Sequence, residues 1–151
     1  MYSIFKRCSV VLVGLLCAQL TGCFTDDSAK LEVVDPYVRA IPSGRTVTAA
    51  FFTLDNKSDQ TCHLVAATAD NVERAELHNH ILEDGLMKMR EVDKVVVPAG
   101  EQTIFKPGGL HIMLYGVSRN MSHGDKIQLT LEFEDCDNLA VDAEVRHPNK
   151  E

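Results

Sequence analysis

Four residues in the middle of the chain are of types that bind soft metal ions: His78, Met89, His111 and Met113. Thioether sulfur is a soft ligand and imidazole a borderline one, and together they suit Cu(I) better than Zn²⁺, Mg²⁺ or Ca²⁺. Alternate side chains of a β-strand share a face, so His111 and Met113 are expected to point the same way while Ile112 turns to the other side. The residue types and this pairing predict a copper site.

Two further residues, His80 and Met87, extend this set as accessory candidates. By the same period of two, His80 shares a strand face with His78, and Met87 shares one with Met89. The segment 83–85, Glu-Asp-Gly, is typical of a hairpin turn, which would bring the histidine pair and the methionine pair together. Taken singly, each of these residues is more often structural, because methionine fills gaps in protein cores and an exposed histidine usually has no special role.

Two other features concern the geometry around these residues. The segment Pro107-Gly108-Gly109 comes just before His111, and two consecutive glycines permit a tight backbone turn that aims His111 and Met113 at the other candidates. Glu76 and Arg90 are expected to form a surface ion pair across the hairpin, a contact that contributes little to stability.

The spacing of the four residues is H-x10-M-x21-H-x-M. It resembles the ligand signature of the PCuAC family, the periplasmic copper chaperones with a cupredoxin-like β-sandwich. The segments GLMKMR, PGGLHIML, DPYVRAIPSG and AAFFTLDN also resemble that family, and the resemblance extends from about residue 33 to residue 145. A spacing match over four ligands is more specific than a lone His-x-Met pair.

This resemblance implies a binding and transfer protein, not an enzyme. It implies that His78, Met89, His111 and Met113 bind one Cu(I) ion and hand it to a copper-accepting protein; whether Cu(II) is also bound is left open by the sequence. The acceptors implied are cytochrome c oxidase subunit II, whose CuA centre such chaperones help assemble, and Sco-type proteins. Neutral thioethers need no deprotonation, so the ligands can be exchanged one at a time with an acceptor.

Two other classes of function remain as alternatives. One is a cupredoxin-like electron carrier or copper enzyme, although a blue-copper site needs a cysteine close to its His and Met ligands, and only six histidines are available for a His-rich dismutase site. The other is a structural lipoprotein module in which the His and Met residues bind no metal. No Gly-x-Ser-x-Gly or His-Glu-x-x-His segment points to a hydrolase.

The pattern of turns and short apolar runs predicts a single all-β domain with a cupredoxin-like Greek-key sandwich. Turn residues recur every eight to twelve positions, and no long segment has the helical period of 3.6. Pro36 is expected to place an edge or a bulge in the first strand. The expected strands are 31–41, 46–54, 62–67, 72–82, 86–92, 94–97, 102–105, 110–117, 126–133 and 139–145.

The start of the chain has the features of a bacterial lipoprotein signal. Residues 1–22 comprise a basic segment, an apolar run and Leu-Thr-Gly before Cys23, which predicts that Cys23 becomes the lipidated first residue. Residues 23–30 would then tether a domain of residues 31–147, followed by a polar tail at 148–151. The protein is expected in the periplasm, anchored to a membrane, and Phe24 favours the outer membrane over the inner one.

Two cysteines, Cys62 and Cys136, remain in the predicted mature domain. An even pair in a chain sent to an oxidising compartment favours a disulfide. The alternative is that one of them is a thiolate ligand of copper. The sequence alone does not show that the two residues are adjacent.

The overall charge argues against binding to nucleic acid. The net charge of the full chain is −7, and removal of residues 1–22 leaves 13 basic and 22 acidic residues, a net charge of −9. Binding to nucleic acid depends on neutralising phosphates with Lys and Arg, which this balance does not favour.

Overall fold

The described part of the chain consists of strands joined by short loops. The computed structural model describes residues 31–41, 44–118 and 121–147. Ten strands and no helix lie in these ranges, which confirms the all-β prediction. The strands are β1 (Leu31–Arg39), β2 (Val47–Asn56), β3 (Cys62–Ala69), β4 (Arg74–Glu83), β5 (Leu86–Glu91), β6 (Val95–Val97), β7 (Gln102–Phe105), β8 (His111–Tyr115), β9 (Lys126–Phe133) and β10 (Leu139–Arg146). Every expected strand is present, and no strand end differs from its expected position by more than two residues.

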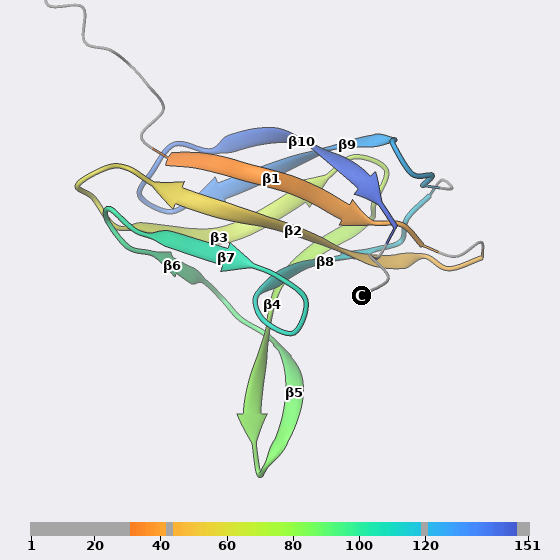
Figure 1. Ribbon diagram of the computed structural model, residues 1–151, viewed down its shortest axis with the longest axis horizontal. Helices are drawn as coiled ribbons and strands as arrows, with labels where there is room; N and C mark the ends of the chain where they lie inside the picture. The colour runs from red at the N-terminus through yellow and green to blue at the C-terminus, as the bar shows by residue number, and fades with distance from the viewer. Residues whose placement is uncertain (1–30, 42–43, 119–120, 148–151) are drawn as a thin grey trace, which may run out of the picture.

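All ten strands belong to one continuous sheet that bends over on itself (Figure 1). The hydrogen-bonded order is β5-β4-β8-β2-β1-β10-β9-β3-β6, and β7 pairs with β2. β1 and β10 run parallel, whereas the other described strand pairs are antiparallel. β3 also packs against β4, and β6 against β7, so strands near the two ends of the order meet and enclose one core.

The core forms because apolar residues alternate with polar ones along the strands. On β9, for example, Ile127, Leu129, Leu131 and Phe133 are buried, whereas the residues between them are more exposed. Side chains at alternate positions of a strand share one face, so this pattern turns a continuous apolar surface towards the opposite layer. The side chains of β2, β4 and β8 also alternate between the core face and the outer face, but Phe51 on β2 and His111 on β8 are buried on the outer face as well.

A bulge in β1 changes which of its residues face the core. The pairing with β2 shifts between Val34 and Tyr37, and Asp35 has a φ of 50°. Val33 packs on the core before the bulge and Val38 after it, although five positions separate them. The extra residue therefore moves Tyr37 to the outer face of the sheet, next to the outward side chains of β2. The expected irregularity at Pro36 is confirmed.

The β4–β5 hairpin extends beyond the two layers (Figure 1). Its turn residues Asp84 and Gly85 have φ values of 52° and 79°, as a type I′ turn requires. β5 pairs with β4 alone, so it is an edge strand. Near the turn, Leu82, Leu86 and Met87 are 69%, 65% and 59% exposed. The hairpin thus presents apolar side chains to the solvent.

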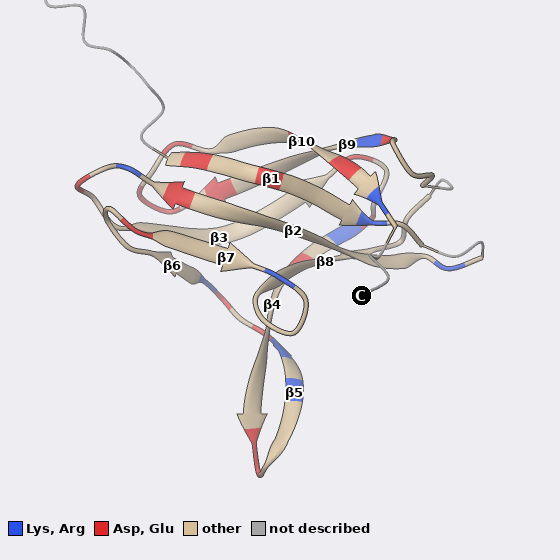
Figure 2. Ribbon diagram, in the orientation of Figure 1, with Lys and Arg blue, Asp and Glu red and all other residues tan. Residues whose placement is uncertain are grey.

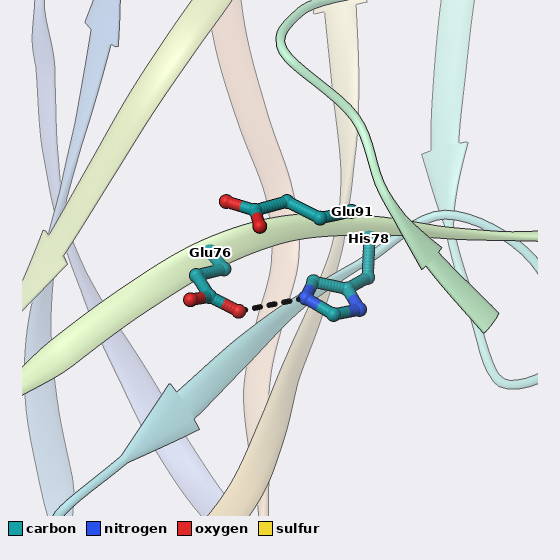
Figure 3. Close-up of side chains that lie close together, drawn as sticks. All are labelled: Glu76, His78 and Glu91. Carbon is teal, nitrogen blue, oxygen red and sulfur yellow. Dashed lines mark hydrogen bonds and ion pairs between the residues drawn. The ribbon is translucent and has the colours of Figure 1, made fainter.

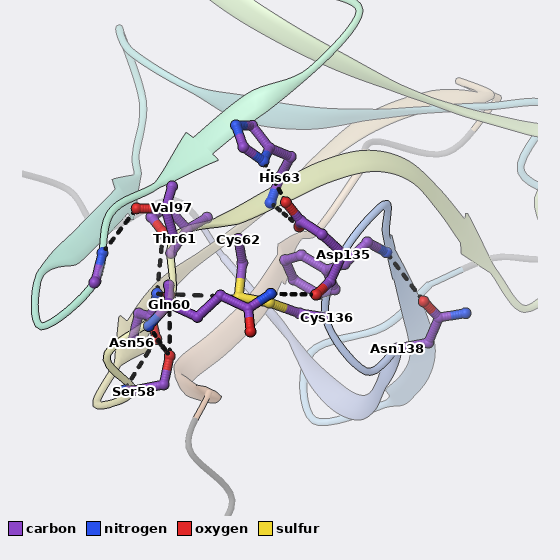
Figure 4. Close-up of a disulfide and its surroundings, with 12 residues drawn as sticks. Asn56, Ser58, Gln60, Thr61, Cys62, His63, Val97, Asp135, Cys136 and Asn138 are labelled. Atoms are coloured by element: carbon purple, nitrogen blue, oxygen red, sulfur yellow. Dashed lines mark hydrogen bonds and ion pairs between the residues drawn. A yellow bond between two sulfur atoms is a disulfide. The ribbon is translucent and has the colours of Figure 1, made fainter.

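A disulfide joins Cys62, at the start of β3, to Cys136, in the loop after β9 (Figure 4). The same loop is held by Asp135, which accepts hydrogen bonds from the backbone N–H of His63 at 2.9 Å and from its ring Nδ1 at 2.7 Å. Nearby, the fully buried Asn56 donates through Nδ2 to the carbonyl oxygen of Val97 at 3.0 Å. Covalent and polar contacts therefore fasten together the end of the sandwich at which β3 begins.

Charged residues are spread over both layers. Among the described residues, Figure 2 shows Lys and Arg scattered between Asp and Glu, not gathered on one element. No helix in the described ranges is long and apolar enough to cross a membrane. The predicted signal peptide at 1–22, the lipidation site Cys23, the tether at 23–30 and the tail at 148–151 all lie outside the described residues.

Candidate metal centre

Three neighbouring strands, β5, β4 and β8, carry the candidate residues. Between β4 and β8, His78 lies opposite His111, and Glu76 lies opposite Met113. Between β4 and β5, His80 lies opposite Met89. Directly opposed residues point to the same face of a sheet, so the register brings all four predicted ligands and His80 to one outer face. The inward face of the same strands carries Leu77, Ile112 and Leu114.

His111 is held with one ring nitrogen facing a methionine sulfur. Its side chain is 3% exposed, and Nδ1 lies 2.8 Å from the carbonyl oxygen of Gly109. A carbonyl only accepts hydrogen bonds, so Nδ1 carries the proton and donates it. Nε2 lies 3.1 Å from Sδ of Met89. Burial lowers the pKa of His111 and favours the neutral ring, so two electron-rich atoms face each other at Nε2 and Sδ.

His78 is held by a carboxylate instead. Its Nε2 lies 2.8 Å from Oε2 of Glu76, and this hydrogen bond is the main cause that lowers the pKa of Glu76. Because an ionised carboxylate accepts only, Nε2 donates the proton. The other ring nitrogen, Nδ1, is buried without any hydrogen-bond partner in the described structure. A buried polar atom without a partner is unfavourable, and here it is a nitrogen with a free lone pair.

The methionines differ in exposure, and the accessory candidates differ in position. Met113 is half-buried on β8, whereas Met89 on the edge strand β5 is 45% exposed. His80 is close to the histidine pair: its ring centroid lies 5.3 Å from that of His111, compared with 5.8 Å between His78 and His111. Met87 lies further along the hairpin and is 59% exposed. Of the two accessory candidates, the structure therefore places His80 against the site.

Phe51, which the sequence pattern did not single out, packs beside His111 on the outer face of the sheet. Phe51 on β2 is 3% exposed but lies outside the core cluster, on the outer face. Its ring centroid lies 6.3 Å from that of His111 and 5.1 Å from that of Tyr37, and the Arg39 guanidinium covers it at 5.4 Å. This packing shields one side of His111 from water. In the sequence, the signal was that two phenylalanines, Phe51 and Phe52, are adjacent. Neighbouring side chains of a strand point to opposite faces, so this pair indicates that both faces of β2 are covered.

Two acidic residues beside His78 were also missed as site residues. Glu91 lies opposite His78 across the hairpin, and Glu76 lies two residues before it on the same face (Figure 3). The predicted ion pair between Glu76 and Arg90 is wrong. Arg90 lies on the opposite face from Met89 and Glu91, and it pairs with Glu83 at 2.8 Å. Glu76 instead pairs with His78 and, at 2.6 Å, with Nη1 of Arg74.

The sheet order, the bulged first strand and a projecting hairpin that brings His and Met side chains together define a class of small all-β domain. Solved structures confirm this fold. The apo PCuAC domain from PmoF1 aligns with a TM-score of 0.67 and 24% identity, over 79% of this chain and 95% of that domain. The Cu(I) form of DR1885 from Deinococcus radiodurans aligns with a TM-score of 0.64 and 31% identity, over 79% of this chain and 81% of that protein.

Residues 31–145 match the family described as "Putative lipoprotein LpqE-like", and the chain belongs to this LpqE-like family. It is also 31% identical over 125 residues to protein RP573 of Rickettsia prowazekii, spanning 80% of this chain and 69% of that protein. The resemblance to PCuAC proteins expected from the sequence is thereby confirmed.

Proposed function

We propose that this protein is a copper chaperone, which binds one Cu(I) ion through His78, Met89, His111 and Met113 and passes it to an acceptor protein. The observation that carries the proposal is the contact of 3.1 Å between Nε2 of His111 and Sδ of Met89, with the ring proton held on the far side by Gly109. Two lone pairs at this distance repel each other unless a cation lies between them. The copper-bound state of the related DR1885 supports the same conclusion.

The distances fit a first-row metal ion. Nitrogen and sulfur ligands bound at ~2.0 and ~2.3 Å in a tetrahedral arrangement lie ~3.5 Å apart, so His111 and Met89 need to separate by only a few tenths of an ångström. His78 supplies its unpartnered Nδ1, because Glu76 holds the proton on Nε2. Two neutral imidazoles and two thioethers favour Cu(I) over Cu(II) and over hard divalent ions.

The exposure of the ligands supports transfer to another protein. His78 and His111 are buried, whereas Met89 is 45% exposed on an edge strand. An incoming ligand can therefore replace Met89 first while the two histidines still hold the ion. Neither cysteine in the described residues offers a thiolate, because Cys62 and Cys136 are joined in the disulfide, and a blue-copper electron carrier is correspondingly disfavoured. The role is one of binding and delivery, without a catalytic step.

Competition titrations test the ligand set. The protein is titrated anaerobically with Cu(I) against a chromophoric Cu(I) chelator, with X-ray absorption to count sulfur and nitrogen neighbours. Met89→Leu combined with Met113→Leu conserves volume and apolarity, so the fold should be retained. Cu(I) affinity should fall at least 100-fold, and each tenfold corresponds to roughly 1.4 kcal/mol of binding free energy. Met87→Leu, on the same strand face but nearer the turn, is the matched control and should change affinity little. Wild-type affinity in the double variant would rule out the thioethers as ligands.

The acceptor we propose is the CuA-bearing subunit II of cytochrome c oxidase, with a Sco-type thiol protein as the other candidate. The test mixes the Cu(I)-loaded protein with the soluble apo domain of each acceptor, separates them and measures the copper in each. Copper that stays with the loaded protein in both mixtures would contradict these acceptors while leaving the binding proposal intact.

Membership of a lipoprotein family supports an anchored location. We propose that Cys23 carries lipid and that the domain faces the periplasm, on the outer membrane. Cys23→Ala should move the protein from the membrane fraction to the soluble fraction, and intact mass should show acyl chains only on the wild type. Density separation of the membranes distinguishes the outer membrane from the inner one.

A further inference from the structure

A second group of potential ligands lies directly beside the proposed Cu(I) site. One ligand atom from each of Glu76, His78 and Glu91 lies within 4.8 Å of the other two, and no other group of three or more His, Cys, Asp or Glu residues with this geometry occurs among the described residues. Figure 3 shows both carboxyl groups on the same side of the His78 ring. The group draws on two strands, since Glu91 of β5 lies opposite His78 of β4.

These donors differ in kind from those of the Cu(I) site. Carboxylate oxygen and imidazole nitrogen are both ligands of Zn²⁺ in proteins, whereas Cu(I) favours thioethers. The two carboxylates also balance the charge of a divalent ion. This combination of donors thus suits Zn²⁺, with a water molecule as the fourth ligand.

Burial shows that this is not only a cluster of surface acids. The side chains of Glu76 and His78 are 13% and 11% exposed, and Nε2 of His78 faces Oε2 of Glu76 at 2.8 Å. Glu91 is exposed and gives the ion a route in from the solvent. Ligands bound at ~2.0 Å in a tetrahedral site lie ~3.3 Å apart, so the exposed Glu91 side chain needs to close by at most about 1.5 Å, which a flexible side chain can do.

We propose that Glu76, His78 and Glu91 form a binding site for a divalent cation such as Zn²⁺, which shares His78 with the Cu(I) site. A neutral imidazole has one free nitrogen lone pair, so His78 serves one ion at a time. When Zn²⁺ binds Nε2 of His78, the ring proton that lay between Nε2 and Glu76 moves to Nδ1. Nδ1 is the nitrogen that would bind Cu(I), so its lone pair is then occupied. Zn²⁺ and Cu(I) therefore exclude each other. Only this exclusion rests on the proposed function.

One cation opposes the binding of Zn²⁺. Nη1 of Arg74 lies 2.6 Å from Oε1 of Glu76, and the same guanidinium lies over the Tyr115 ring at 4.6 Å. The Arg74 side chain is 61% exposed, so it can move into the solvent while Oε2 remains directed at His78. Removal of this charge should strengthen the divalent site, and Arg74→Gln is expected to raise Zn²⁺ affinity several-fold.

The experiment titrates the disulfide-bonded protein with Zn²⁺ against a chromophoric zinc chelator and records the visible spectrum with Co²⁺ as a probe of coordination. One equivalent of Zn²⁺ should bind. Glu91→Gln should lower Zn²⁺ affinity roughly tenfold or more while Cu(I) affinity stays near the wild-type value. Glu101→Gln, an exposed glutamate in the turn before β7, is the matched control and should retain both affinities.

The Met89→Leu, Met113→Leu double variant separates this inference from the proposed function. It should keep Zn²⁺ binding while Cu(I) binding is lost. Absence of Zn²⁺ binding by the wild type, or wild-type Zn²⁺ affinity in Glu91→Gln, would overturn the divalent site. A stable complex that holds both Zn²⁺ and Cu(I) would overturn the sharing of His78. Zn²⁺ binding that depends on Glu91 in a protein without Cu(I) affinity would support the divalent site and contradict the chaperone proposal.

Discussion

The two buried histidines of the site are held by different kinds of partner. The Gly109 carbonyl keeps the proton of His111 on Nδ1, and the Glu76 carboxylate keeps the proton of His78 on Nε2. The proposed Cu(I) ion would therefore be bound by Nε2 of one ring and Nδ1 of the other. The hydrogen-bond partner of the second ring nitrogen sets the tautomer of each histidine. The two rings therefore offer different nitrogens because Gly109 and Glu76 differ, and not because of the strand register.

Phe51 supports His111 from below, so its loss should affect binding as well as stability. Phe51→Leu is expected to lower the free energy of unfolding by about 1–2 kcal/mol and to weaken Cu(I) affinity severalfold, because His111 becomes less constrained. Phe52→Leu is the matched control, since Phe52 points into the core and stacks on Phe105 at 4.4 Å. It should lower stability by a similar or larger amount without changing affinity. Denaturation curves measure the stability of both variants, and Cu(I) competition titrations measure their affinity. Equal losses of Cu(I) affinity in the two variants would contradict this role for Phe51.

At the scale of the elements, the β4–β5 hairpin determines where Met89 lies. The type I′ turn at Asp84-Gly85 sets the pairing of β5 with β4, and a slip of one residue would turn Met89 to the other face. The hairpin can be perturbed separately from the sandwich, since β5 has no other partner strand.

Gly85→Ala should therefore reduce Cu(I) affinity with little change in thermal stability. Alanine at a φ of 79° is strained by roughly 1 kcal/mol, which favours a changed turn and register. Gly100→Ala is the control, because Gly100 has a φ of 69° and open space around it in the turn between β6 and β7. Gly100→Ala should lower the melting temperature slightly and leave affinity unchanged. The comparison is measured by thermal melts and Cu(I) competition, and an unchanged affinity in Gly85→Ala would show that the turn does not position Met89.

The connection between β3 and the loop after β9 should give a defined pH dependence. The hydrogen bonds from His63 lower the pKa of Asp135 below its usual value of 3.8. A carboxyl group with a lowered pKa in the folded state stabilises the protein at pH values above 3.8, and this contribution is lost as the pH falls through the lower, folded-state pKa. Asp135→Asn should thus be less stable than the wild type at neutral pH, and the difference should shrink below about pH 4. Urea unfolding from pH 7 to pH 3 measures this, with Asp93→Asn as the exposed control; a difference that grows on acidification would contradict the assignment.

The sequence predicted the elements better than it predicted the contacts between them. Turn residues and alternating apolar positions are local signals, so all ten strands were placed to within two residues. The positions of Glu91 and Phe51 depend on which strands are neighbours and in what register, and a single sequence carries little information on either. The mistaken Glu76–Arg90 pair has the same origin, because the register puts Arg90 on the other face of β5. The four proposed ligands were first indicated by their residue types and the His-x-Met pairing, and it was the match of their spacing to a family that distinguished them from structural His and Met residues.

At the scale of the whole molecule, the disulfide fastens β3 to the loop after its sheet neighbour β9, and none of the four proposed ligands lies on these segments. Cys62 and Cys136 are 74 positions apart, and closing a loop of that length stabilises the folded state by up to about 4 kcal/mol on the chain-entropy model. Replacing both with alanine should lower the melting temperature strongly and leave one Cu(I) bound per chain. Thermal melts and copper stoichiometry test this, and a folded double variant that no longer binds copper would place a cysteine in the site.

The parallel pairing of β1 with β10 has a consequence for the order in which the chain folds. It joins the first described strand to the last, so the sheet stays open between β1 and β9 until Leu139–Arg146 has been synthesised. Contacts between such distant parts of a chain make folding slow, on the order of milliseconds to seconds for all-β domains of this kind. During that time two strand edges are available to pair with other chains. Chains that end before Leu139 are therefore expected to aggregate, and the final eight-residue strand completes the domain.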